Sequence, residues 1–329
     1  MPQSPDNSPL CKICGQPSTL LASHLFDDRY GYPGRFHVFV CSACGFGQTK
    51  PELNKKDLDA LYTDYYPRKN INKESVENAA DWKSGLWARW LRWLRGTNNT
   101  CHYHVRPETR VLDVGCGNGA SLLEIQRMGA EAFGTEQDRN VTQIASDLHL
   151  NIFFGNVEEA NYPHEFFHTI TLSQVLEHIP DPLQFTAFLY TKLAPGGNLI
   201  MSFPNIDSYY RKKIGKRWIN WHIPYHLNFF SEKSLEILAA KTGLRIKTIC
   251  TITPKVWVEL QQRNNRFEAI EGKSSPIWTS GNTQETSGRW KQRCEAMHAL
   301  CMSLLQLPLI RIRDLRKQGD SWLVIMEKS

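Results

Sequence analysis

The sequence contains no long apolar run. No stretch of its 329 residues reaches the roughly 18 apolar residues that a membrane-spanning helix needs. Residues 1–9 are polar and proline-rich, and they lack the apolar core of a secretory signal peptide. These absences predict a cytoplasmic protein whose residues 1–10 form a disordered tail. Cysteines stay reduced in that compartment, so we expect the nine cysteines to act as ligands rather than as disulfides.

Charge of either sign is moderate. The chain is 22% charged and 41% hydrophobic, which is typical of a soluble globular protein. The net charge of +6 is compatible with a nucleic acid, a phosphorylated ligand or an anionic membrane surface as a partner, but it requires none of them. At this length the chain forms one large domain or two ordinary ones, and either arrangement buries a full core.

Four cysteines stand in two C-x-x-C-G pairs, Cys11 with Cys14 and Cys41 with Cys44. Each pair turns the chain so that two thiolates converge, and two such pairs supply the four sulfurs of a tetrahedral zinc site. Four protein ligands leave no open position on the metal. The spacing therefore predicts structural zinc in a small ribbon over residues 11–50.

The stretch Val111–Ala120, V-L-D-V-G-C-G-N-G-A, is typical of a buried strand that turns sharply into a helix. Gly115, Gly117 and Gly119 allow positive φ angles and close approach of a ligand, while the helix that follows directs unpaired N–H groups at it. The glycines also fit the loose dinucleotide pattern, so they do not select a cofactor. Asp113 does select between cofactors, because an acid at the end of the strand attracts a cationic ligand and repels a pyrophosphate.

Strands and helices alternate through the rest of the chain. This rhythm predicts a parallel, doubly wound α/β sheet. We expect six strands over residues 110–114, 131–136, 151–154, 167–173, 198–203 and 246–253. We expect helices over residues 121–128, 139–149 and 231–241, and one that opens at Asp181-Pro182.

With Asp113 and the glycines in place, Val111–Ala120 resembles the first motif of the class I S-adenosylmethionine-dependent methyltransferases. The resemblance implies that residues 321–327 form a seventh strand, inserted antiparallel between the fifth and the sixth. Glu136 ends the second strand, where an acid accepts both ribose hydroxyls. Asn156 and Val157 match the adenine-side position, although Asn156 replaces the usual acid.

The segment after the fourth strand, S-Q-V-L-E-H-I-P-D-P, resembles that of small-molecule methyltransferases of this class. In this segment Gln174 is a candidate to line the cofactor, and Glu177 and His178 are candidates for a catalytic base or for a structural role. The sequence lacks the (N/D)-P-P-(Y/F) segment that is common in nucleic-acid amino-methyltransferases. That absence disfavours methylation of base nitrogens, but it does not exclude other RNA methylation.

The aromatic loop over residues 218–230, W-I-N-W-H-I-P-Y-H-L-N-F-F, carries three further candidates for chemistry: His222, Tyr225 and His226. It resembles a loop of ribbon-bearing methyltransferases related to the sugar C-methyltransferases. Methyl transfer needs an aligned acceptor that loses a proton, and a histidine of near-neutral pKa suits that task. His226 is the preferred base. The alternative is that it only holds the loop by hydrogen bonds.

Aromatic and basic residues near this loop bear on the acceptor. Trp218, Trp221 and Tyr225 favour a flat or cyclic acceptor. The basic run Arg211–Arg217 suits a diphosphate, or it is a solvated face. The tyrosines of residues 61–66 line the site or pack the ribbon against the core.

The pattern of residues 81–95 predicts a basic amphipathic helix, with tryptophans and leucines on one half and arginines on the other. We expect its apolar half to pack on the protein, and the alternative is an anionic membrane surface. Between the last two strands, residues 254–319 are too long for a usual connection and are read as an insertion or lid. Within them, residues 273–288 are expected to be mobile and residues 289–307 helical.

Together these features predict a seven-stranded Rossmann-like methyltransferase sheet with a zinc ribbon and a helical insertion before the last strand. The domains are residues 11–50 (ribbon), 51–100 (helical linker and N-terminal cover) and 101–329 (methyltransferase). The predicted activity is S-adenosylmethionine-dependent methyl transfer to a small molecule, most specifically a carbohydrate such as a nucleotide sugar or glycan precursor. The alternatives are an RNA methyltransferase and a binding module without turnover.

Overall fold

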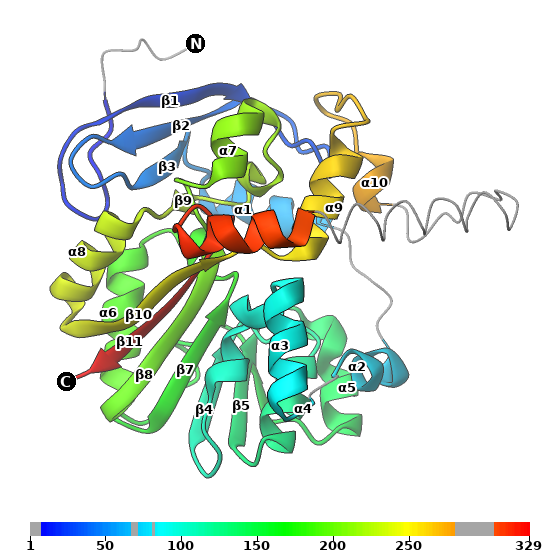
Figure 1. Ribbon diagram of the computed structural model, residues 1–329, viewed down its shortest axis with the longest axis vertical. Helices are drawn as coiled ribbons and strands as arrows, with labels where there is room; N and C mark the ends of the chain where they lie inside the picture. Colours follow the sequence, from blue (N-terminus) through cyan, green and yellow to red (C-terminus); the bar gives the residue numbers. More distant parts are fainter. Residues whose placement is uncertain (1–7, 67–71, 81–82, 280–305) are drawn as a thin grey trace, which may run out of the picture.

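Two β-sheets organise the chain (Figure 1). The computed structural model describes residues 8–66, 72–80, 83–279 and 306–329. The large sheet consists of β4 (Arg110–Val114), β5 (Glu131–Glu136), β6 (Ile152–Phe154), β7 (Phe167–Ser173), β8 (Leu193–Pro204), β10 (Leu244–Ile252) and β11 (Ser321–Lys328). The small sheet consists of β1 (Ser18–Leu25), β2 (Phe36–Cys41), β3 (Gly47–Lys50) and β9 (Asn228–Phe229).

The large sheet has the order β10-β11-β8-β7-β4-β5-β6. Its strands are parallel except for β11, which runs antiparallel to both β8 and β10. The predicted Rossmann-like methyltransferase sheet is therefore confirmed, including the inserted antiparallel last strand. Strand order reverses between β4 and β7, so the carboxyl ends of these two strands border the crevice where such sheets bind ligands.

Helices cover both faces of the large sheet, and others join it to the small sheet (Figure 1). The N-terminal helices are α1 (Lys55–Ala60), α2 (Lys73–Ala79) and α3 (Leu86–Arg95). Those of the sheet domain are α4 (Ala120–Arg127), α5 (Thr142–Asp147), α6 (Pro182–Lys192), α7 (Tyr209–Ile214) and α8 (Glu232–Thr242). Beyond β10 lie α9 (Lys255–Asn264), α10 (Pro276–Thr279) and a helix of residues 306–315.

Local chemistry explains where the helices begin and end. Asp181 caps α6 by accepting hydrogen bonds from the backbone N–H groups of Leu183 and Gln184. Ser231 caps α8 in the same way, and Gly243 ends that helix with a φ of +76°. These caps stand where the sequence predicted them.

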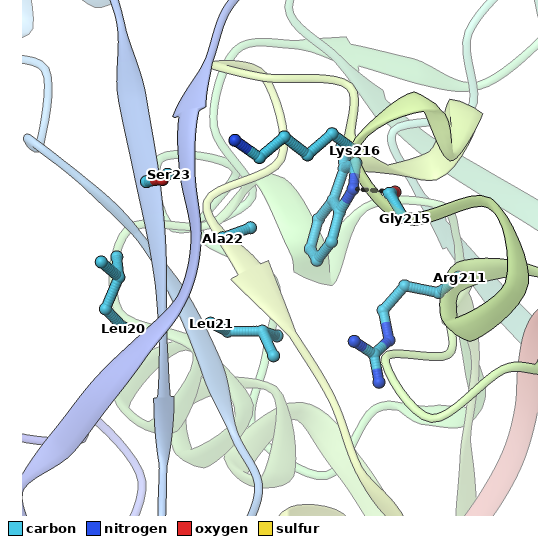
Figure 2. A pocket seen from close by; sticks show the side chains of 8 residues that line it. Leu20, Leu21, Ala22, Ser23, Arg211, Gly215 and Lys216 are labelled. Atoms are coloured by element: carbon cyan, nitrogen blue, oxygen red, sulfur yellow. Dashed lines mark hydrogen bonds between the residues drawn. The ribbon is translucent and has the colours of Figure 1, made fainter.

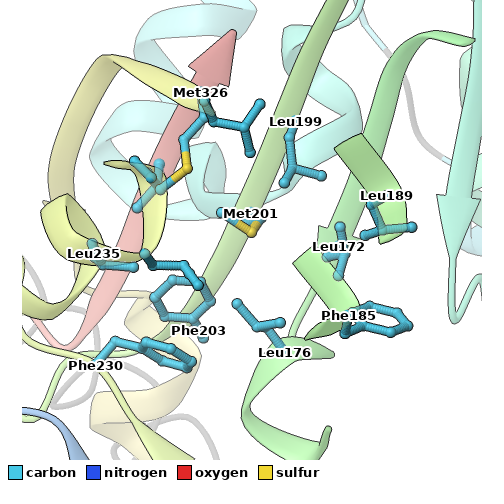
Figure 3. Close-up of a cluster of buried hydrophobic side chains, with 14 of the residues drawn as sticks. Leu172, Leu176, Phe185, Leu189, Leu199, Met201, Phe203, Phe230, Leu235 and Met326 are labelled. Carbon is cyan, nitrogen blue, oxygen red and sulfur yellow. The ribbon is translucent and has the colours of Figure 1, made fainter. Parts of the chain in front are cut away.

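The main core lies between β7, β8, β11 and the helices α6 and α8 (Figure 3). Leu172, Met201, Phe203, Leu235 and Met326 are buried there. The ribbon shares this core, since Ile13, Phe46 and three of its cysteines belong to the same buried cluster. Apolar burial at about 25 cal/mol per Å² thus holds the ribbon and the sheet together.

One expected packing arrangement is wrong. No residue of α3 is buried, and Leu86 and Trp87 are 83% and 69% exposed. The half-buried residues of the helix are Ala88, Leu91, Arg92 and Leu94, so two of its leucines pack on the domain while Leu86 and the tryptophans of the helix face outward. Residues 1–7, Trp82 and most of the stretches predicted as mobile (273–288) and helical (289–307) lie outside the described residues. No helix among the described residues is both long and apolar enough to cross a membrane.

Candidate active site

The turn after β4 lines a pocket of about 270 Å³ at the carboxyl ends of β4, β7 and β8. Gly117 has a φ of +56°, and an added Cβ there would meet nothing within 4 Å, so its backbone faces open space. Gly119 has a φ of +84°, and a Cβ there would lie 2.4 Å from Leu150. The first glycine thus leaves room for a ligand and the second permits close packing of the turn. Gly115, at φ +68°, also lines the pocket.

Asp113 lies at the floor of this pocket, at the end of β4. Its carboxylate accepts hydrogen bonds from the hydroxyls of Ser121, at 2.5 Å, and Thr171, at 2.6 Å. Burial raises the pKa of this carboxyl, while nearby His102 lowers it. A cationic group bound in the pocket would offset the cost of burying the charge. The pocket wall from Asn99 to His102 was not predicted, because no motif marks it.

Glu136 and Asn156 lie at neighbouring strand ends. The Glu136 carboxylate accepts a hydrogen bond from the backbone N–H of Gly117 at 2.8 Å. Gln137 donates its side-chain amide to Asn156 Oδ1 at 2.8 Å and so joins the ends of β5 and β6. Val157 is buried beside them, and Gln174 lines the pocket with a positive φ of 59°. The fold therefore brings all the predicted cofactor residues to one edge of the sheet.

The four predicted catalytic residues meet in a buried cluster beside β7. His226 packs edge-on against His178 and His222, with ring centroids 4.9 Å apart in each pair. His222 stacks on Tyr225 at 4.6 Å. None of the four lines the pocket around Asp113. Gln174 does, and it connects the pocket to the helical turn that carries His178.

Backbone carbonyls set the tautomers of two of these histidines. His226 Nδ1 lies 2.8 Å from the Asn220 carbonyl, and His178 Nδ1 lies 2.9 Å from the Tyr225 carbonyl. A carbonyl only accepts, so each Nδ1 carries the hydrogen and each Nε2 keeps a free lone pair. Burial lowers the pKa of both rings, that of His178 to about 4. Both imidazoles are therefore neutral at pH 7 and keep a lone pair on Nε2, but burial makes them weaker bases than the near-neutral histidine that the sequence suggested.

Glu177 completes the cluster. Its backbone carbonyl accepts the N–H of Leu227, and its side chain is fully buried. One ligand atom each from Glu177, His178 and His226 lies within 4.8 Å of the others. Burial raises the pKa of Glu177 to about 8, so the carboxyl is neutral at pH 7. The sequence offered Glu177 as a base or as a structural residue, and the fold adds its contact with the aromatic loop.

The tyrosines of residues 61–66 contact both the histidine cluster and the ribbon. Tyr62 places its hydroxyl 3.3 Å from His178 Nδ1, and its ring contacts Tyr225. Tyr66 packs against Tyr225 and also against Tyr30 of the ribbon. Both Tyr62 and Tyr66 remain partly exposed. They present aromatic surface beside the histidine cluster.

The prediction that Trp218 offers stacking surface is wrong, whereas Trp221, although largely buried, lines a pocket between β1 and α7. Their exposed fractions are 1% and 5%. Trp218 donates its indole N–H to Asp320 at 2.9 Å, and Trp221 donates to the Gly215 carbonyl at 2.9 Å. Both rings are core residues that fix the loop. Tyr225 is buried too, and its hydroxyl bonds to the Leu61 carbonyl.

Part of the basic run borders a second pocket, of about 230 Å³, between β1 and α7 (Figure 2). Arg211 and Lys216 point toward it from one side and Leu20 to Ser23 of β1 form the other. Arg217 turns away and donates to the Asn264 and Phe267 carbonyls. Within the described residues the run is therefore not a continuous solvated face.

The four ribbon cysteines converge as predicted. The Sγ atoms of Cys11 and Cys44 are 3.5 Å apart, and those of Cys14 and Cys41 are 3.4 Å apart. A disulfide would bring them to about 2.05 Å, whereas bonds of about 2.3 Å to one zinc ion give a tetrahedral edge of about 3.8 Å. The glycines after each pair have φ of +76° and +73°, which suits the tight turn. The donor set fits zinc.

The ribbon also holds the aromatic loop. Thr49 of β3 donates its backbone N–H to the Leu227 carbonyl and its hydroxyl to the His226 carbonyl, at 3.0 and 2.8 Å. Strand β9, from the same loop, pairs with β3. Ser231 donates its hydroxyl to the Cys44 carbonyl at 2.5 Å. The loop that carries His226 is therefore fixed from the zinc-ribbon side.

Comparison with known proteins agrees with this geometry. The profile of a family described as "Methyltransferase domain" matches residues 74–249, which is more than half of the chain. The chain belongs to this methyltransferase family. The predicted enzyme class, an S-adenosylmethionine-dependent methyltransferase, is thereby confirmed, whereas the site residues, zinc and the carbohydrate acceptor stay predictions.

Individual relatives are similar over part of the chain. The methyltransferase is 33% identical over 176 residues to the ubiquinone biosynthesis O-methyltransferase of Xanthomonas campestris pv. campestris (strain B100), covering 49% of this chain and 73% of the relative. It is 27% identical over 157 residues to that of Shewanella sp. (strain ANA-3), covering 44% and 66%. A SAM-dependent methyltransferase structure from Archaeoglobus fulgidus superposes with a TM-score of 0.43 at 16% identity, covering 84% of this chain and 100% of that one.

Proposed function

We propose that this methyltransferase transfers a methyl group from S-adenosylmethionine to a hydroxyl of a small-molecule acceptor, most specifically a carbohydrate. The observation that carries the proposal is the buried Glu177–His178–His226 cluster next to the glycine-rich pocket. It supplies neutral proton acceptors beside a site suited to a cationic nucleoside. The relatives' names, which specify O-methyl transfer, support an oxygen acceptor.

The residues around the pocket fit S-adenosylmethionine. Asp113 would offset the charge of its amino group, Gly115 to Gly119 would approach its methionine part, and Gln174 would line the same wall. Glu136 would accept the ribose hydroxyls, and Asn156 with Val157 would border the adenine. When bound, the cofactor supplies a methyl group on a sulfonium, which is already a good leaving site. The protein then has to orient the acceptor and accept its proton.

His226 is the residue that we assign to the acceptor's proton. Its Nδ1–H is held by the Asn220 carbonyl, so Nε2 is the atom that accepts. As the acceptor oxygen bonds to the methyl group, its proton passes to Nε2. The imidazolium that results lies near Glu177, which is neutral before the transfer and whose pKa the new positive charge would lower. His178 and His222 orient His226 by ring contacts, and Tyr225 stacks on His222.

A carbohydrate acceptor is supported by the surfaces around this cluster. Tyr62 and Tyr66 are exposed and adjacent, and aromatic faces pack against sugar rings. Arg211 and Lys216 offer cations to a phosphorylated acceptor. The Arg211 side chain retains a buried Nε–H that has no partner within the described residues.

Zinc in the cysteine site would act through the ribbon. Its four ligands leave no coordination position for an acceptor, so the metal would stabilise the fold that carries Thr49 and β9. In this proposal zinc positions the loop of His226 and takes no part in methyl transfer.

The test is incubation of the protein with isotopically labelled S-adenosylmethionine and cell extracts, followed by mass spectrometry of the products. A labelled carbohydrate or nucleotide sugar supports the proposal, and it is lost in Asp113→Ala. Labelled RNA instead of a small molecule would overturn the acceptor class. Equal labelling by wild type and Asp113→Ala would overturn the assigned cofactor site.

A further inference from the structure

Helix α3 covers only part of its apolar surface: Leu91 and Leu94 are half-buried, whereas Leu86 and the tryptophans of the helix are exposed. Leu86, Trp90 and Trp93 form one stripe at i, i+4 and i+7, and all three are exposed. Arg92 faces the domain, with its guanidinium 5.1 Å from the Tyr103 ring centre. A helix of an isolated soluble domain buries its apolar stripe and exposes its charges. The stripe of α3 that the described residues leave exposed therefore points to a partner.

The helix of residues 306–315 lies next to α3 and adds a second exposed stripe. Arg311 donates to the Trp93 carbonyl at 2.9 Å and so joins the two helices (Figure 1, cyan and red). Leu309, Ile312 and Leu315, at i, i+3 and i+6, are exposed, whereas Leu307 and Ile310 are buried. The second helix thus packs on the domain through one apolar face and exposes another apolar face to solvent.

The charge on this surface is of one sign. Helix α3 has the sequence L-W-A-R-W-L-R-W-L-R, with three arginines and no acid. Within the described residues, Arg89 and Arg95 are exposed and form no ion pair. Asp314, the acid of the second helix, is buried and paired with Arg311 at 3.1 Å. Exposed cations flank the tryptophan stripe without competing acids.

We propose that α3 and the helix of residues 306–315 form a docking surface for an anionic phospholipid bilayer. Tryptophan rings favour the headgroup region, where the apolar ring is buried and the indole N–H stays hydrated. The arginines on the same surface attract anionic headgroups, and leucines extend into the acyl boundary. The segment after α3 forms the wall of the cofactor pocket at Asn99 and Thr100, so docking places that pocket near the lipid surface.

The charge pattern favours lipid over a second copy of this chain. A dimer through this surface would bring the arginines of two α3 helices together, and like charges at an interface are unfavourable. An anionic bilayer complements both the tryptophan stripe and the arginines.

The experiment is co-sedimentation of the full chain with phosphatidylcholine vesicles, with and without phosphatidylglycerol. We expect binding that requires phosphatidylglycerol, weakens when salt rises from about 50 to about 500 mM, and shifts tryptophan emission to the blue. The double variant Trp87→Ser/Trp90→Ser should bind at least about tenfold more weakly. Phe267→Ser, an exposed aromatic away from this surface, is the matched control and should bind as wild type.

Charge reversal separates the electrostatic part. Arg89→Glu/Arg95→Glu should lose the dependence on phosphatidylglycerol, while Arg266→Glu, an exposed arginine on the α9 side, should keep it. Circular dichroism and cofactor binding should match wild type in every variant, because the altered side chains are exposed. Equal sedimentation of wild type and the tryptophan variant would overturn the proposal. A failure of the wild type to bind vesicles would also overturn the proposal. The same holds if gel filtration shows a dimer that the tryptophan variant dissociates.

Discussion

At the scale of single residues, Glu177 is the fully buried acid of the histidine cluster. Neither of its carboxylate oxygens has a hydrogen-bond partner within the described residues. Burial favours the neutral form and raises its pKa to about 8. A neutral Glu177 leaves His178 and His226 neutral as well, so the cluster avoids an isolated buried charge.

The raised pKa of Glu177 predicts a pH dependence of stability. Between about pH 4.5 and 8 the folded protein keeps this proton and the unfolded chain releases it, so the free energy of unfolding falls as pH rises. Relative to Glu177→Gln, wild type should lose about 1.4 kcal/mol per pH unit in that window. Urea unfolding of both proteins across the window measures the difference. Parallel pH profiles would show that the acid is ionised in the folded state.

His226→Ala tests the assigned base. Turnover should fall by about 10²- to 10⁴-fold, the usual effect of removing a general base. The affinity for S-adenosylmethionine should not change, because His226 does not line the cofactor pocket. Single-turnover rates and calorimetric cofactor titration separate the two, with the exposed His164→Ala as control. Unchanged turnover would leave His226 only its hydrogen-bonding role in the loop.

At the scale of elements, the pairing of β3 with β9 joins the ribbon to the catalytic loop. The two strands share a short antiparallel register, Gly47 with Phe229 and Gln48 with Asn228. Thr49 extends this contact to the carbonyls of His226 and Leu227. A small displacement of the ribbon therefore moves the histidine cluster, and misplacement of a reacting group by a fraction of an ångström lowers the rate.

Thr49→Val tests this coupling, since it removes the hydroxyl and keeps the shape and the backbone N–H. The His226 carbonyl loses a buried donor, so we expect about 1–2 kcal/mol of destabilisation and a turnover reduced about three- to tenfold. Cofactor affinity should stay constant. Thr19→Val on exposed β1 is the matched control, because its hydroxyl contacts the Val40 carbonyl away from the site. An equal loss of cofactor affinity in Thr49→Val would contradict a role confined to the loop.

At the scale of the whole molecule, the cysteine site stabilises a ribbon whose core continues into the sheet domain. Burial raises the pKa of the Cys11 and Cys44 thiols, so without a cation these two sulfurs would favour their neutral forms. A zinc ion would reverse that preference by binding the thiolates. The metal would then support both the fold and the loop of His226.

Metal analysis should find about one zinc per chain. Cys14→Ser should lose it and lower the melting temperature by more than about 5 °C, with turnover falling in parallel. Cys250→Ser, a partly buried cysteine outside the ribbon, is the control. Loss of metal without a change in melting temperature or turnover would contradict the structural role.

The sequence by itself determined the sheet, the cofactor turn and the cysteine set, since each is written in local spacing. Strand and helix periods, the acid before the glycines and the C-x-x-C-G pairs need no knowledge of distant partners. Only the tertiary structure decided which aromatic residues face solvent. Trp218 and Trp221 are buried, and Asp320 and the Gly215 carbonyl accept hydrogen bonds from their indole N–H groups. The tryptophans of α3 are exposed instead. The amphipathic pattern specifies that a helix has an apolar side. What that side packs against is decided by residues that are distant in the sequence.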